Sequence, residues 1–222
     1  MRGVDRPLLA PAPPRAVDRA GASASAWITL FSAGVFLAGC GTGRSSAAGG
    51  GDGGTRTYHP DASCLVTIQS PPVEPGIHVP IGTDIQYDSN PPSSGQHYPI
   101  WAKFQIYDSP VPRGYYVHDL EHGAVVLLEN CGGGGCPDDV VTELQSVTDA
   151  IADDPLCAAA GEGVRVRALI TPDPLVDTPI AAAAWGWTYT AACLDVPSLQ
   201  QFVVGHYGQG PEAICTNGTS DF

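Results

Sequence analysis

The spacing of apolar residues predicts five regular elements in the second half of the chain. Residues 123–128 form a short apolar run between turn-forming residues, which indicates a buried strand. Residues 164–170 begin with apolar and polar side chains in alternation, as in a half-buried strand, and 180–189 predicts a further strand. Helical spacing of apolar residues predicts one helix from Pro137 to Asp154 and a last helix over 195–204.

The first half of the domain is rich in Pro and Gly, with turn signals such as Asn90-Pro91-Pro92. We expect extended or looping chain there, with short strands possible at 64–68 and 84–87. The order strand, helix, strand, strand, helix predicts an α+β fold. It is a single domain in which two helices pack on an antiparallel or mixed sheet.

The N-terminal segment has the pattern of an export signal. Residues 20–43 carry no charge, and the apolar run 26–38 is 13 residues long, too short for a bilayer core, which needs about 20. Basic residues precede the run, and small residues follow it. The sequence Leu37-Ala38-Gly39-Cys40 resembles the bacterial lipobox at all four positions, which implies cleavage before Cys40 and acylation of that residue. The stretch before the apolar run is long, which indicates that Met1 is an over-extended start or that this region is unusual.

The expected organisation is therefore a signal peptide (1–39), a lipidated Cys40 with a Gly/Ser-rich tether (40–57), and a folded domain (58–222). The tether reaches roughly 20 Å as a flexible coil. The residue after the cysteine is Gly41 and not Asp, the residue that signals retention in the inner membrane of Gram-negative bacteria. If the organism is Gram-negative, this pattern implies delivery to the outer membrane. The predicted location is the extracytoplasmic face of the cell envelope.

The charge of the chain limits the classes of partner that it is expected to bind. Four of the ten basic residues and two of the 23 acidic ones precede Cys40, which leaves 6 against 21 and a net charge of −15 after it. Nucleic acid and anionic lipid head groups need basic patches, so neither is expected to bind the domain. Cations are the favoured small partners, although the acidity also suffices to keep an exported domain soluble.

The domain contains an even number of cysteines, which in an exported protein predicts disulfides. They are Cys64, Cys131, Cys136, Cys157, Cys193 and Cys215. Three bridges allow fifteen pairings, and the sequence does not choose among them. The flexible Cys131–Cys136 loop could close on itself, and we favour a structural disulfide there over zinc.

Two histidine motifs carry the candidate chemistry and a family resemblance. Tyr87…Asn90-Pro-Pro-Ser-Ser-Gly-Gln-His97-Tyr98 and His118-Asp-Leu-Glu-His122-Gly-Ala-Val-Val126 resemble the signatures of the domain of unknown function 3105 family. The resemblance extends from about His78 to Glu212. It supports the domain boundary and implies no established activity.

The residues themselves predict a metal site. In a helix His118 and His122 would share one face about one turn apart, whereas in a strand they would lie roughly 13 Å apart. If the turn before His97 folds it back, His97, His118 and His122 become three imidazole ligands suited to Zn or Cu. Glu121 could orient a ligand or act as a base, and His78 and His206 are outer candidates.

Two alternatives stay open. The same histidines could brace loops through hydrogen bonds, giving a structural or protein-interaction module without metal. The order His118-x-x-Glu121-His122 also matches the inverted zinc-protease motif, which lies on a helix, whereas the following apolar run predicts a strand here. A metal-dependent hydrolase is therefore the least favoured hypothesis, and no catalytic residue is assigned.

Overall fold

The computed structural model describes residues 64–132 and 136–222, all within the unit Asp52–Phe222. The expected signal peptide, Cys40 and the tether lie outside the described residues and stay predictions. Within the described part, every helix is too short or too polar to span a bilayer.

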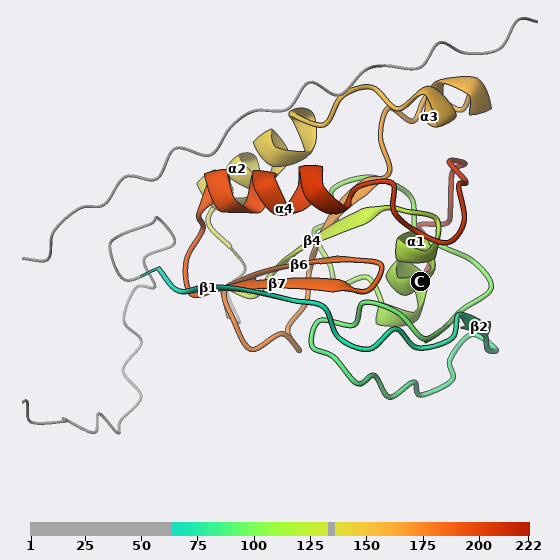
Figure 1. The fold of residues 1–222 in the computed structure, drawn as a ribbon, viewed down its shortest axis with the longest axis horizontal. Helices are drawn as coiled ribbons and strands as arrows, with labels where there is room; N and C mark the ends of the chain where they lie inside the picture. Colours follow the sequence, from blue (N-terminus) through green and yellow to red (C-terminus); the bar gives the residue numbers. More distant parts are fainter. Residues whose placement is uncertain (1–63, 133–135) are drawn as a thin grey trace, which may run out of the picture. The chain divides into compact units, whose positions relative to one another are not determined.

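A five-stranded mixed sheet forms the centre of the domain (Figure 1), as the predicted α+β class requires. Its order is β1 (Val66–Gln69), β7 (Trp187–Ala191), β6 (Ile180–Ala184), β4 (Val125–Glu129) and β5 (Ala168–Pro172). The pair β4–β5 is parallel, and the other neighbouring strands are antiparallel.

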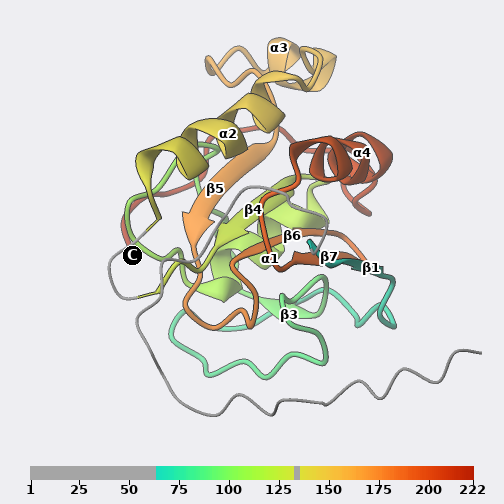
Figure 2. The same cartoon turned by 90° about the vertical axis from the view of Figure 1, so that its left-hand side faces the viewer.

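Helices cover both faces of the sheet. Alternate residues of a strand point to opposite sides, so apolar residues in succession give both faces a surface to bury. On one face, Leu127 and Ala182 pack with α2 (Asp138–Asp149) and α4 (Val196–His206), which lie above the sheet in Figure 2. On the other face, Leu128 packs against α1 (Arg113–Glu121). The central strands β4 and β6 are therefore buried on both sides.

Four helices are present in the described residues, so the expectation of two was wrong. The helices α2 and α4 were predicted, since each buries one apolar face. The helix α1 has no such pattern because every residue from Gly114 to Leu120 is buried, so polar and apolar residues alike face protein. The fourth helix, α3 (Pro155–Ala160), has six residues and follows an Asp154 cap.

The strand predictions need three corrections. Residues 180–189 are not one strand, because the chain reverses at Trp185-Gly186, where Gly186 has φ +72°, and forms the hairpin β6–β7. The strand β5 begins at Ala168, later than the alternation suggested. Residues 84–87 are irregular chain that lies alongside the core.

The six cysteines of the described residues form three disulfides: Cys64–Cys193, Cys131–Cys136 and Cys157–Cys215. The first joins the chain just before β1 to the segment after β7, and the second closes the short loop before α2. The third joins α3 to the C-terminal segment.

Candidate metal centre

Two histidines of the candidate site lie at the end of α1. The helical conformation places His118 and His122, the C-cap residue, one above the other, with their Nε2 atoms 3.1 Å apart. The strand alternative, which would have separated these side chains, is thereby excluded.

The other two histidines come from a small parallel strand pair beside α1. In this pair, β2 (Ile77–His78) and β3 (Gln96–His97), His78 lies directly opposite His97. The amide of Tyr98 donates to the carbonyl of Gly114 at 2.9 Å, which ties β3 to the start of α1. As a result, the ring centroids of His78 and His97 lie 4.8 and 4.7 Å from that of His118.

Hydrogen bonds at the Nδ1 atoms set the tautomers of two rings. His97 Nδ1 lies 2.8 Å from the carbonyl oxygen of Gly95, and His118 Nδ1 lies 2.7 Å from that of Tyr98. A carbonyl oxygen only accepts, so both Nδ1 atoms carry the hydrogen. In a neutral ring Nε2 then has a free lone pair, which is the usual arrangement of a histidine metal ligand.

Two carboxylates approach the Nε2 atoms of His97 and His122. Glu121 Oε2 lies 3.0 Å from His97 Nε2, and Glu212 Oε2 lies 3.3 Å from His122 Nε2. One ligand atom from each of His78, His97, His118 and Glu121 falls within 4.8 Å of all the others. A Cβ added at Gly76 would overlap the Glu121 carboxylate, which would have to move from this position.

Burial keeps two of the imidazoles neutral. His118 and His122 are 3% and 1% exposed. Loss of hydration lowers the pKa of His118 to about 3, and the bond to the Tyr98 carbonyl offsets only part of this. Loss of hydration also lowers the pKa of His122 to about 4, and the negative charge of Glu212 opposes part of this shift. Neutral imidazoles are the form that binds metal ions.

An unpaired buried nitrogen lies in the middle of this group. His97 Nε2 is shielded from solvent and has no hydrogen-bond partner among the described residues. It faces a carboxylate oxygen at 3.0 Å, and two acceptors at that distance repel unless a proton or a metal cation lies with them. The donor set of neutral imidazoles and a carboxylate fits a divalent transition-metal ion.

The structure separates His206 from the other predicted ligands, and His122, although its Nε2 lies 3.1 Å from that of His118, is not a member of the group of four. The ring of His206 stacks on Trp187 at 4.3 Å between centroids and contacts Phe202, on the face of the sheet covered by α2 and α4. Sequence reasoning missed Glu212 and Trp101, whose ring lies 4.6 Å from that of His122. Neither residue belongs to a motif with metal-ligand spacing, so the sequence carried no signal for them.

A second group of potential ligands, Glu129, Cys131 and Cys136, is a weaker candidate. Both sulfur atoms are bonded to each other, and a disulfide lacks the thiolate that binds metal.

Comparison with protein families returned a match. Residues 78–217 match the family described as "Protein of unknown function (DUF3105)". The matched region contains His78, His97, Glu121, His122 and Glu212, together with His118. No curated protein and no solved structure matched the chain.

Proposed function

We propose that this chain, which belongs to the DUF3105 family, binds a divalent transition-metal ion, Zn²⁺ or Cu²⁺, between His97, His118 and His122. The observation that carries the proposal is the close approach of His97 Nε2 and Glu121 Oε2, at 3.0 Å, beside the His118 ring. A metal ion at this point would be coordinated by both atoms.

The spacing of His118 and His122 supports this assignment. His118 and His122 present their Nε2 atoms to each other at 3.1 Å, close to the roughly 3.3 Å expected between two ligands of a tetrahedral ion with bonds of about 2.0–2.1 Å. Glu121 completes the set as a ligand or as the partner that orients His97. His78, on the exposed side of the cluster, is positioned to receive or release the ion.

Metal analysis of the purified, tag-free protein tests the proposal. We expect about one Zn or Cu per chain, and a rise in Tm when Zn²⁺ is added to metal-free protein. His118→Ala should abolish both effects, and Glu121→Gln, at a less buried position, should weaken binding without the same cost in folding. His206→Ala is the matched control, since it removes a histidine outside the cluster and should leave binding intact.

An ion-free result would favour the alternative of a structural or protein-interaction module. In that case His97 and His118 act through their bonds to the carbonyls of Gly95 and Tyr98. Wild-type protein that contains no metal, and whose Tm is unchanged by Zn²⁺ and Cu²⁺, would overturn the metal proposal.

One observation favours a metal-dependent hydrolase as a second candidate. The segment His118-x-x-Glu121-His122 lies at the end of a helix, the setting that the inverted zinc-protease motif requires. Against this, the Glu121 carboxylate is engaged with His97. Hydrolysis of peptide or ester substrates by zinc-loaded protein, lost in Glu121→Gln, would support this candidate.

We also propose that the domain is held at the extracytoplasmic face of a bacterial membrane through lipid on Cys40. The apolar run 26–38, the lipobox and the three disulfides support this location. Mass spectrometry of the mature N-terminus should find acyl groups on Cys40, and Cys40→Ala should move the protein from the membrane fraction. An unmodified Met1 in the membrane-bound protein would contradict the proposal.

A further inference from the structure

The last fifteen residues, Gly208–Phe222, form an arm that returns from the end of α4 toward α1 (Figure 1). The amide of Gly208 donates to the carbonyl of Gly123 at 2.8 Å, and the amide of Glu212 donates to the carbonyl of Glu121 at 2.9 Å. These bonds attach this C-terminal arm to the segment that carries two of the candidate ligands.

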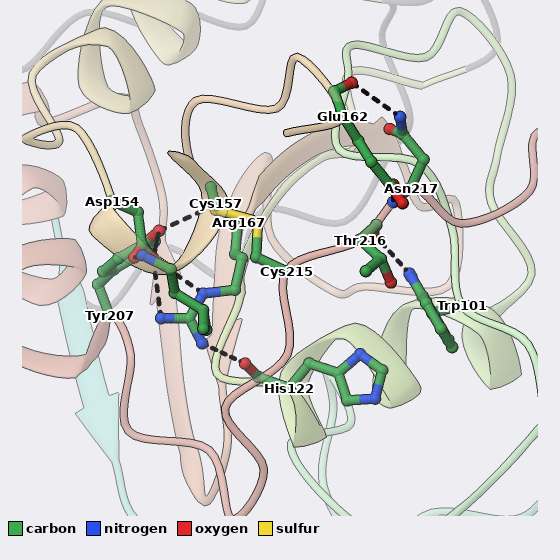
Figure 3. The surroundings of a disulfide bond; sticks show 11 residues. Trp101, His122, Asp154, Cys157, Glu162, Arg167, Tyr207, Cys215, Thr216 and Asn217 are labelled. Carbon is green, nitrogen blue, oxygen red and sulfur yellow. Dashed lines mark hydrogen bonds and ion pairs between the residues drawn. A yellow bond between two sulfur atoms is a disulfide. The ribbon is translucent and has the colours of Figure 1, made fainter. Parts of the chain in front are cut away.

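The second half of the C-terminal arm is fixed by a covalent bond and by Trp101 (Figure 3). Cys215 forms a disulfide with Cys157 of α3. Trp101 Nε1 donates to the carbonyl of Thr216 at 3.0 Å, and the ring of the same tryptophan contacts His118 and His122. The arm and the wall of the histidine cluster are therefore one connected structure.

The arm places a carboxylate at ligand spacing. Glu212 Oε2 lies 3.3 Å from His122 Nε2, which itself lies 3.1 Å from His118 Nε2. Atoms bound to one tetrahedral ion at about 2.0–2.1 Å lie roughly 3.3 Å apart, so each of these two separations, taken as a pair, fits a shared ion. His122 and Glu212 are not members of the group formed by His78, His97, His118 and Glu121.

The charge at the cluster also favours a second carboxylate. A divalent ion with neutral imidazoles and Glu121 alone retains one positive charge in a largely buried site, which is costly without compensation. Glu212 brings the formal charge to zero. A buried cation beside the cluster, Arg167, is paired with Asp154 and donates to the backbone carbonyl of His122, so it does not depend on this carboxylate for a counter-charge.

We infer that Glu212 is a ligand of the metal centre and that the Cys157–Cys215 disulfide holds it in place, so that the centre is complete only once this bond has formed. The inference rests on the proposed metal binding and adds to it a residue 90 positions from His122.

Titration of the metal-free protein with Zn²⁺ separates the inference from the proposal beneath it. Glu212→Gln keeps the size of the side chain, removes its charge and should weaken Zn²⁺ binding by at least about tenfold. Asp221→Asn makes the same charge change on the same arm and should leave the affinity within twofold. Wild-type protein without affinity for Zn²⁺ would overturn both the proposed metal binding and the inference about Glu212. Equal affinities of wild type and Glu212→Gln would overturn only the inference.

The role of the disulfide is tested with serine variants, which add no free thiol. Cys157→Ser/Cys215→Ser should lower the affinity for Zn²⁺ by up to the factor seen for Glu212→Gln, whereas Cys131→Ser/Cys136→Ser should not. If the first variant fails to fold, Trp101→Phe removes the hydrogen bond to Thr216, makes the ring beside His118 and His122 smaller, and should weaken binding in the same direction. Unchanged affinity in the variant that folds would contradict a role for these attachments.

Discussion

Arg167 and Asp154 form a buried ion pair: Nη2 and Nε of the arginine lie 2.9 and 3.0 Å from Oδ2 of the aspartate. The side chains are 7% and 6% exposed. Arg167 also donates to the backbone carbonyl of His122 (Figure 3), so this pair supports the end of α1 where the candidate ligands lie.

Replacing Asp154 with Asn should destabilise the protein by about 3 kcal/mol or more, because Arg167 stays buried without its counter-charge. The asparagine side chain could still accept the helix-cap hydrogen bond from the Leu156 amide through its Oδ1 atom. The loss of stability therefore reports on the interactions of Asp154 Oδ2. Urea unfolding measures the difference. Asp153→Asn is the control: its side chain is 86% exposed, its ion pair with Arg165 is at the surface, and the change should be under about 1 kcal/mol. Similar losses in both variants would count against the buried pair.

The same pair should make stability depend on pH in the acid range. Burial raises the pKa of Asp154, but hydrogen bonds from Tyr207, Leu156 and Arg167 outweigh it and lower the pKa below its usual value of 3.8. The unfolded chain therefore binds the proton first, and stability rises with pH. The advantage of wild type over Asp154→Asn should be complete above the unfolded pKa and shrink as the pH falls through the folded one. A constant advantage from pH 7 to pH 2 would contradict this account.

Sequence reasoning succeeded where an element has one buried face. In α4, Leu199, Phe202 and Val203 are buried while Val204 is exposed, so the helical period was visible in the residue pattern. In α1 the polar residues His118 and Asp119 are as buried as Tyr116, and the pattern vanishes. The helix that carries the site is hidden from sequence analysis because the site buries its polar side.

The candidate site itself was only partly predictable. His118 and His122 are four residues apart, so their proximity follows from one local conformation. The position of His97 depends on the parallel pairing with His78, and that of Glu212 on a disulfide chosen from fifteen pairings. Both are long-range contacts that spacing along the chain does not encode.

In the metal-free protein, His118 and His122 should remain neutral at pH 5. Burial lowers the pKa of His118 to about 3 and that of His122 to about 4, so neither ring takes up a proton until the solution is more acidic. The unfolded chain protonates its histidines near pH 6.5, so the stability of metal-free protein should fall as the pH is lowered from about 6.5. Imidazole NMR shifts followed against pH check this, with urea-unfolded protein as the reference. Titration of either ring near pH 6.5 in the folded state would contradict it.

Two glycine substitutions should have opposite effects on stability. A Cβ at Gly210 would overlap the backbone of Gly123 and the carbonyl of Glu121, so Gly210→Ala should push the C-terminal arm from α1 and cost about 1–3 kcal/mol. Gly205 lies near the end of α4 with nothing within 4 Å of a new Cβ, and Gly205→Ala should stabilise the protein by about 0.5–1 kcal/mol through its higher helix propensity. Thermal unfolding of the metal-free variants measures both. A neutral Gly210→Ala would mean that the arm does not pack closely on the end of α1, and would weaken the assignment of Glu212 with it.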